Sequence, residues 1–143
     1  MLPDNWFAWA LLSAGFAALT AIFAKVGLEG IDSDYATLVR TVVIIACLAL
    51  FVGVAGKWRN PLSLSSKTLL FLGLSGLATG ASWVCYFRAL KLGQASEVAP
   101  VDKLSVILVA VFATIFLGER PSPQHWFGIA LVGVGVVILG IKW

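Results

Sequence analysis

Charged side chains stand at a few positions inside otherwise apolar stretches of this chain. In residues 99–112, "APVDKLSVILVAVF", Asp102 and Lys103 follow Pro100 within a hydrophobic run. Similar surroundings hold Lys25, Arg40 and Arg88. Ionisable groups at membrane depth are rare, and they usually face the interior of a helix bundle or a water-filled cavity. If these stretches cross a membrane, the charged residues are the candidates for contacting a substrate or carrying a coupling proton.

The composition predicts that the stretches do cross a membrane. Of the 143 residues, 60% are hydrophobic and 12% are charged, and the mean hydropathy is +0.98, whereas a soluble domain is about half apolar and about a quarter charged. A helix needs roughly 20 apolar residues to cross a bilayer. We therefore predict an all-α integral membrane protein with one transmembrane domain over residues 1–143. Its five predicted transmembrane helices are residues 6–28, 35–55, 68–90, 95–117 and 124–141.

The connections between the predicted spans are short, so the function is expected to lie within the membrane. Residues 56–67 form the only connection long enough for a small loop, and Ser65 or Ser66 is expected to cap the helix that follows. The sequence has no nucleotide-binding glycine loop and no metal-ligand spacing, and Cys47 and Cys85 stand singly. A net charge of +3 is too small to indicate nucleic acid as a partner. We expect neither enzymatic activity nor a metal or cofactor.

The candidate charges lie toward the same side of the membrane. We name the sides A and B, with the first span beginning at side A. Lys25, Arg40, Arg88 and Asp102 then all fall in the side-B half, and Asp102 lies roughly 10 Å deep. Successive residues of a helix point about 100° apart, so Asp102 and Lys103 are expected on different faces. Asp102 should pair with Arg40, Lys25 or Arg88 on another helix, while Lys103 lies at a helix seam or extends toward side B.

The surroundings of these charges favour a hydrated cavity. Pro100 lacks an amide donor and disturbs the turn before it, and irregular backbone at membrane depth is tolerated only where protein or water covers it. Residues 98–103 are therefore expected to border the cavity. Trp83 and Tyr86, one turn apart in the third span, either line it or pack against a neighbouring helix.

Two interpretations of the charges remain open. They contact a substrate or a proton, or they are structural, with a buried ion pair between Asp102 and Arg40 and with Lys25 and Arg88 extending to the headgroups. Because cations outnumber acids among these residues, the first interpretation favours an anionic substrate.

The basic residues of the connections and span ends are divided evenly between the two sides. Side A has Lys57, Arg59, Lys67 and Arg120, and side B has Lys25, Arg88, Lys91 and Lys142. Because an excess of lysine and arginine sets orientation, this division favours insertion in both orientations; the alternative is one orientation set by the translocation machinery. Glycines recur at seven-residue spacing in the fifth span and let helices approach closely, either between subunits or within one chain.

Several stretches together are similar to one known family. They are "AIFAKVGL", Arg40, "YFRALKLG", "VAPVDKLSVILVAVFATIFLGERPS" and "GIALVGVGVVIL". Over residues 6–143 the chain resembles the EamA domain of the drug/metabolite transporter superfamily, and "APVDKLS" resembles its single-repeat, five-span bacterial and archaeal branch. The resemblance implies a bundle whose first four spans line a cavity. It also implies that the characteristic positions are Lys25, Arg40, Asp102, Lys103 and Glu119.

The resemblance further implies a function and an assembly. Most EamA proteins carry two domains in inverted orientation, so a single domain is expected to form a homodimer, antiparallel if it is to supply the inverted half. The first hypothesis is a secondary transporter in the prokaryotic inner membrane, for efflux or exchange of a small organic metabolite. Arg40 and Lys103 would hold an anionic group, Asp102 would orient them or couple a proton, and Trp83 and Tyr86 would form an apolar wall. The alternatives are a flippase for an anionic lipid carrier and a non-transporting membrane subunit.

Overall fold

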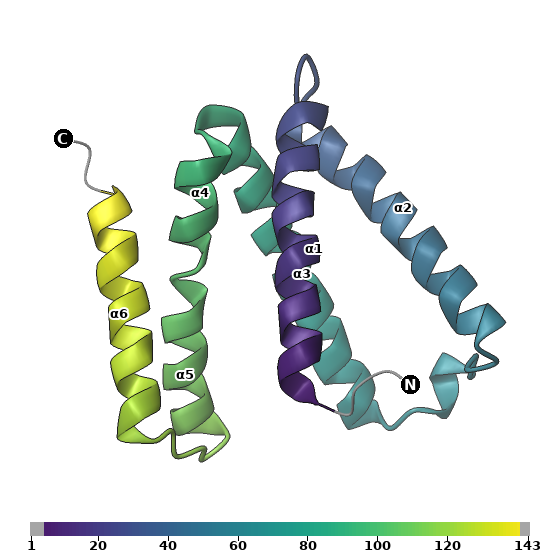
Figure 1. Cartoon of the computed structure of the whole chain (residues 1–143). Helices are drawn as coiled ribbons and strands as arrows, with labels where there is room; N and C mark the ends of the chain where they lie inside the picture. The colour runs from purple at the N-terminus through teal and green to yellow at the C-terminus, as the bar shows by residue number, and fades with distance from the viewer. Residues whose placement is uncertain (1–4, 141–143) are drawn as a thin grey trace. The chain divides into compact units, whose positions relative to one another are not determined.

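The computed structural model describes residues 5–140, and all regular structure in this range is helical. Figure 1 shows the long elements, which are α1 (Trp6–Gly27), α2 (Ser33–Val54), α3 (Ser66–Leu92), α4 (Ala95–Asp102), α5 (Ser105–Phe116) and α6 (Pro123–Gly140). A short 3-10 helix, η1 (Pro61–Ser63), lies in the connection between α2 and α3. Ile141, at the end of the predicted fifth span, and Lys142, counted on side B, lie outside the described residues.

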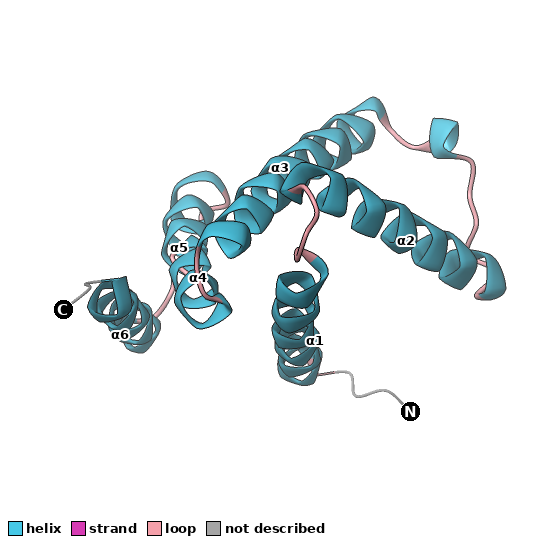
Figure 2. Cartoon of the chain, turned by 90° about the horizontal axis from the view of Figure 1, so that it is seen from above, coloured by secondary structure: helices cyan, strands magenta, loops and turns pink. Residues whose placement is uncertain are grey.

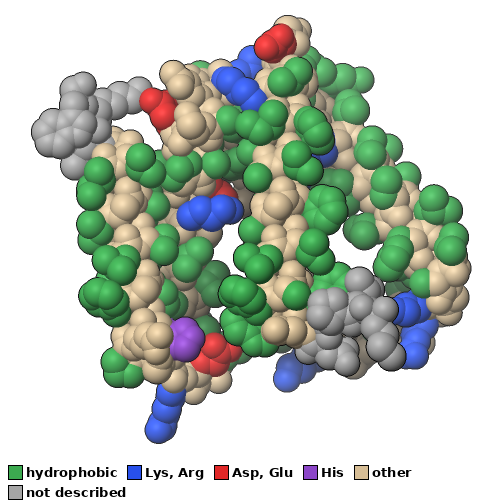
Figure 3. Space-filling view, viewed as in Figure 1, with side chains coloured by type: hydrophobic (Ala, Val, Ile, Leu, Met, Phe, Trp, Pro, Cys, Tyr) green, Lys and Arg blue, Asp and Glu red, His purple; other side chains and the backbone are tan. Residues whose placement is uncertain are grey.

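Five helical segments are long and apolar enough to cross a membrane, which confirms the predicted all-α membrane fold. Their ends agree with the predicted spans to within two residues, and the fourth segment combines α4 and α5. Figure 3 shows hydrophobic side chains along the sides of the helices, with most charged side chains at helix ends. Exposed apolar surface of this extent would promote aggregation in water. In a bilayer it is the surface that faces lipid.

Local hydrogen bonds determine where the helices begin and end. The Asp32 carboxylate accepts hydrogen bonds from the amides of Asp34 (2.9 Å) and Tyr35 (3.0 Å), so α2 begins before the predicted position. Of the two predicted serines, Ser65 caps α3, because its hydroxyl oxygen accepts the amide of Thr68 at 3.1 Å. These side chains satisfy amides that have no partner within the helix.

A glycine ends α5. The backbone at Gly118 has a φ of 68°, a left-handed conformation that glycine adopts without steric cost. The amides of Leu117 and Glu119 both donate to the Ala113 carbonyl, at 3.0 and 3.2 Å. The left-handed turn at Gly118 therefore provides hydrogen-bond donors for a carbonyl at the helix end. The need for this conformation explains the glycine in the "LGE" stretch.

The chain forms two compact units. Residues 23–92 make up the first, which we name the hairpin unit, and residues 1–22 with 93–143 make up the second, the C-terminal unit. In the hairpin unit, α2 and α3 lie close together where α2 begins and α3 ends, which is side B, and they diverge toward η1 (Figures 1 and 2). The buried side chains of this unit are Ala24, Leu28, Ser33, Thr37, Phe87 and Leu90. They belong to the last turn of α1 and the residue after it, the first turns of α2 and the end of α3, so the most buried part of the unit lies at side B.

In the C-terminal unit, α6 packs along both α4 and α5. The side chains of Ala110 on α5 and Val136 on α6 are buried. At Gly133 a Cβ atom would lie 2.8 Å from Cδ1, the end of the flexible Ile107 side chain. A glycine at this position therefore allows α5 and α6 to approach, as small residues do in membrane helix packing.

We expect Gly133→Leu to lower the stability of the C-terminal unit. The added side chain would overlap Ile107 and force α5 and α6 apart, and overpacking of this kind costs about 1–3 kcal/mol. Gly135→Leu is the matched control, because a Cβ atom at Gly135 has no neighbour within 4 Å. Thermal unfolding of the purified protein in detergent should show a lower midpoint for the first variant only. Equal midpoints would contradict this account of the packing.

Candidate functional site

The centre of the candidate site is Arg40, about 10 Å along α2 from its first residue. Its guanidinium carbon lies 4.2 Å from the centre of the Trp83 ring and 5.2 Å from that of Phe87. The two aromatic residues are four apart on α3, so their rings are neighbours on one helix face. A cation over aromatic faces is attracted by their negative π surfaces, and more strongly where water is partly excluded. Together, Arg40, Trp83 and Phe87 form what we name the arginine shelf.

The arginine shelf leaves the hydrogen-bonding edge of Arg40 available. Over residues 5–140 the structure places no carboxylate within ion-pair distance of this guanidinium, and Tyr86 is close enough to interact with it electrostatically. The contact with the aromatic rings does not use the five N–H donors of the guanidinium as hydrogen bonds to carboxylates. The shelf therefore holds a cation whose fork can still bind a planar anion.

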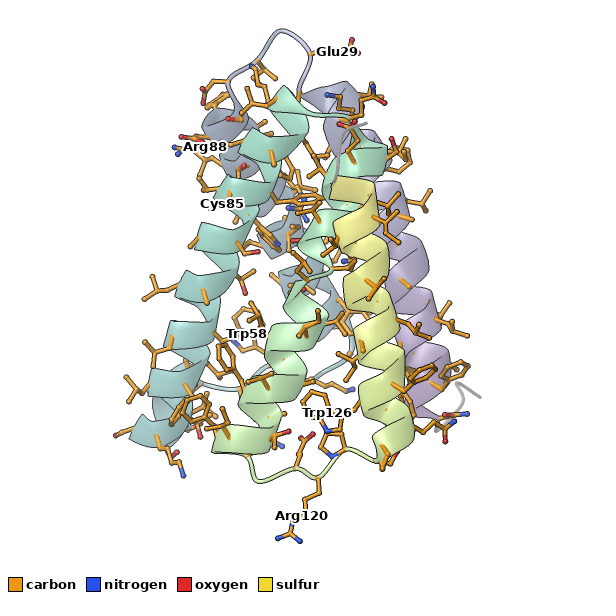
Figure 4. The ribbon with its side chains drawn as sticks, turned by 90° about the vertical axis from the view of Figure 1, so that its left-hand side faces the viewer. Glu29, Trp58, Cys85, Arg88, Arg120 and Trp126 are labelled. Atoms are coloured by element: carbon orange, nitrogen blue, oxygen red, sulfur yellow. The ribbon has the colours of Figure 1, made fainter. Side chains whose placement is uncertain are left out.

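The other predicted cations of the hairpin unit already bond to protein acceptors. Lys25 Nζ donates to the Leu90 carbonyl at 2.6 Å, which places a positive charge at the end of α3. Arg88 donates from Nε to Asp34 Oδ1 at 2.8 Å and from Nη2 to Oδ2 at 2.5 Å. Both cations therefore connect helices, and Asp34 is a partner that the sequence analysis did not consider. Figure 4 shows Arg88 near the same end as Glu29, away from Trp58.

The two predicted aromatic residues have different positions. Trp83 belongs to the arginine shelf, as its i, i+4 spacing to Phe87 permits, but the sequence analysis did not single out Phe87. The Phe87 side chain is almost completely buried, with 3% exposed. Tyr86 is half-buried, and its ring centre lies 6.5 Å from that of Phe87 in a tilted arrangement. The spacing from Trp83 was the available signal for Phe87.

Asp102 and Lys103 lie in the C-terminal unit, where the fourth span is broken. The amides of Lys103 and Leu104 donate to the carbonyls of Pro100 and Val101, both at 3.0 Å, three residues back instead of four. The disturbance was expected in the turn before Pro100, but α4 continues through Pro100 and the break follows it by two residues.

The expectation that Asp102 and Lys103 occupy separate faces was wrong. Lys103 Nζ lies 3.3 Å from Asp102 Oδ2, because the long, flexible Lys103 side chain reaches the carboxylate of its neighbour. Whether Asp102 also meets Arg40, Lys25 or Arg88 stays a prediction. Glu119, the remaining position implied by the resemblance, lies in the connection after α5.

Other chemistry-bearing residues have structural explanations. His125 Nδ1 lies 2.7 Å from the Ser122 hydroxyl, which also accepts the His125 amide at 3.3 Å at the beginning of α6. Figure 4 shows Trp126 beside the connection from which Arg120 points outward. Cys47 and Cys85 are free thiols, and the described residues contain no group of three or more potential metal ligands.

Comparison with known proteins gives a consistent result. The model of the EamA-like transporter family matches residues 4–141. An uncharacterized transporter in the cobO 3'region of Sinorhizobium sp is 54% identical over 98% of this chain and 99% of its own length. An uncharacterized protein of Methanocaldococcus jannaschii is 27% identical over 97% of this chain and 98% of its own.

A further relative has a more specific name. The probable 4-amino-4-deoxy-L-arabinose-phosphoundecaprenol flippase subunit ArnE of Salmonella enteritidis is 30% identical over 68% of this chain and 95% of its own length. No solved structure matches the chain. The family match over nearly the whole sequence confirms the resemblance drawn from the sequence, and five apolar helices agree with it. The chain belongs to the EamA-like transporter family, and it is a multi-pass transporter of the inner (plasma) membrane.

Proposed function

We propose that this transporter moves a small organic metabolite that carries a carboxylate or phosphate group, by alternating access as an antiparallel homodimer. The observation that carries the proposal is the arginine shelf. Arg40 is the one candidate cation in the hairpin unit for which the described residues provide aromatic faces but no carboxylate or carbonyl partner. An arginine held in this way within a span is suited to receive an anion from outside the protein.

The chemistry of the arginine shelf favours a planar or tetrahedral oxyanion. A guanidinium presents two parallel N–H donors that match a carboxylate or a phosphate, and contact with Trp83 and Phe87 restricts its movement before the anion arrives. An ammonium on a flexible chain would supply the charge without this geometry. The rings also provide an apolar wall for the organic part of a substrate.

Asp102 and Lys103 provide the coupling element of this proposal. Their side chains form a partly exposed ion pair where the fourth span is broken, at 3.3 Å. In this proposal Asp102 orients the cations that hold the anion or couples a proton to transport.

The proposal includes a dimer because the five described spans correspond to one repeat. Transporters with inverted repeats bind their substrate at the interface between two oppositely oriented halves, and this chain of five spans supplies one half. A second copy in the opposite orientation would supply the other. The even division of basic residues between side A and side B supports this assembly.

A second candidate is a flippase, or a subunit of one, for an anionic lipid carrier. It is supported by similarity to the relative whose name is that of a phosphoundecaprenol flippase subunit, at 30% identity. The arginine shelf would serve this function equally, because the phosphate of a lipid carrier has the same hydrogen-bonding geometry as that of a metabolite.

The experiment that tests the proposal uses the purified protein in proteoliposomes on a solid-supported membrane. The probes are benzoate, acetate, glycerol 3-phosphate and glucose 6-phosphate as anions, and choline as a cation. We expect currents with at least one anion, none with choline, and none from protein-free liposomes. Currents with choline alone would overturn the proposal. No current with any probe, together with translocation of a fluorescent polyprenyl phosphate, would favour the flippase. No current and no translocation would favour the non-transporting subunit.

A further inference from the structure

We infer that side B of the hairpin unit is closed by a reversible clamp, which must open for a substrate to reach or leave the arginine shelf from that side. The clamp consists of Asp34 and Arg88, with Lys91 and the carbonyl of Ile31 beside them. This inference rests on the proposed function, because only a transporter that alternates access requires such an opening. It gives Arg88 the role of a positioning residue and not of a substrate ligand.

The first part of the clamp is the fork between Arg88 and Asp34. Nε and Nη2 of Arg88 bond to the two carboxylate oxygens of Asp34, at 2.8 and 2.5 Å, across 54 residues of sequence. The pair joins the first turn of α2 to the end of α3. A bidentate fork of this kind is geometrically specific.

The second part lies one turn further along α3. Lys91 Nζ donates to the carbonyl of Ile31, in the segment just before α2. Arg88 and Lys91 are three residues apart, so they lie on one face of the helix. Two cations of α3 therefore hold two consecutive parts of the chain, the connection at Ile31 and the start of α2 at Asp34.

Exposure of the fork indicates a contact that can open and close. The Arg88 side chain is 60% exposed and the Asp34 side chain 46% exposed. Ion pairs in contact with water add little to stability, because water replaces the partner at small cost. Phe87 and Leu90 nearby are buried, so apolar packing also contributes to the contact between the helices. The ion pair between Arg88 and Asp34 can therefore break and re-form, and in this way it can regulate a local separation of α2 and α3.

The arrangement of α2 and α3 places the clamp between side B and the arginine shelf. The two helices are close at side B and diverge toward η1 (Figures 1 and 2). Arg40 lies six residues beyond Asp34, roughly 9 Å along the axis of α2. A route from side B to the arginine shelf therefore begins at the clamp, and separation of Asp34 from Arg88 would uncover it.

The test measures access to a reporter cysteine and requires no substrate. Thr41→Cys, in a background of Cys47→Ser and Cys85→Ser, places a thiol next to Arg40 and one turn beyond the buried Thr37. The purified protein in proteoliposomes is labelled with a membrane-impermeant maleimide. We expect Asp34→Asn to raise the labelling rate at least threefold, and Asp34→Arg combined with Arg88→Asp to return it to the parent rate. Glu29→Gln is the matched control, since it removes an exposed acid of the same connection (Figure 4).

Thermal unfolding separates a reversible clamp from a permanent structural contact. We expect Asp34→Asn to keep the parent midpoint while its labelling rate rises. An unchanged labelling rate would overturn the inference, and so would a rise that accompanies a lower midpoint or that the exchanged pair fails to reverse. Because labelling is independent of transport, the clamp can fail while anion-driven currents persist. Conversely, currents can be absent while the clamp behaves as expected.

Discussion

Replacement of Arg40 by glutamine should lower the apparent affinity for a transported anion by about 100-fold. The variant keeps a polar side chain of similar length but loses the charge and the fork. Loss of one partner from a desolvated, hydrogen-bonded charge pair costs about 2–5 kcal/mol, and about 2.8 kcal/mol corresponds to 100-fold. Concentration series on the solid-supported membrane, with whichever anion probe gives a current in the parent protein, would measure this change.

Two further variants separate the charge of Arg40 from its geometry. Arg40→Lys retains the charge, so we expect a loss of about tenfold that reflects the missing fork. Trp83→Leu retains Arg40 but removes the larger ring, and a cation–π contact of about 1 kcal/mol gives a loss of about fivefold. Arg120→Gln is the matched control, because this arginine points away from the connection between α5 and α6 (Figure 4). If Arg40→Gln transports as well as Arg120→Gln, the arginine shelf is not the anion site.

The transmembrane fold was predictable because it depends on properties of single residues. The apolar runs set the number and length of the spans, and Ser65 was one of the two serines expected to cap α3. The first residue of α2 was harder to predict from the sequence. It depends on the Asp32 carboxylate accepting two amides, and the sequence offers Ser33 and Asp34 beside it as competing caps.

The contacts of the candidate site depend on how each helix is rotated about its axis, which apolar runs leave undetermined. The spans that face lipid on most sides show little amphipathic pattern, so nothing in the sequence indicated that Arg40 faces Trp83 and Phe87. The same uncertainty concealed the pairing of Arg88 with Asp34.

The error at Asp102 and Lys103 has a different cause. The expectation of separate faces considered the directions of the two side chains and not their length, and the flexible Lys103 side chain reaches the Asp102 carboxylate. Pro100 was expected to disturb the turn before it, whereas α4 continues through Pro100 and the tight turn lies after it. A helical wheel therefore does not exclude contact between long side chains that are adjacent in sequence.

Expression of the chain should place each connection on both sides of the membrane. Leu64→Cys lies between α2 and α3 and Glu29→Cys between α1 and α2, so within one chain they mark opposite sides. In the cysteine-free background, we expect an impermeant maleimide to label roughly half of each variant in intact cells, because lysine and arginine are evenly divided between side A and side B. Complete labelling of one variant with none of the other would establish a single orientation and contradict the antiparallel homodimer.

Added lysines that fix the orientation of the chain allow the antiparallel homodimer to be tested by transport. Ser63→Lys with Leu64→Lys adds two cations to side A, and Glu29→Lys with Gln94→Lys adds two to side B, which should fix opposite orientations by the positive-inside rule. If the working unit is an antiparallel pair, each biased chain alone should lose transport, since it lacks the inverted half. Expression of the two together should restore it, because they supply both orientations. Full transport by either biased chain alone would show that one orientation is sufficient and would rule out the antiparallel pair as the working unit.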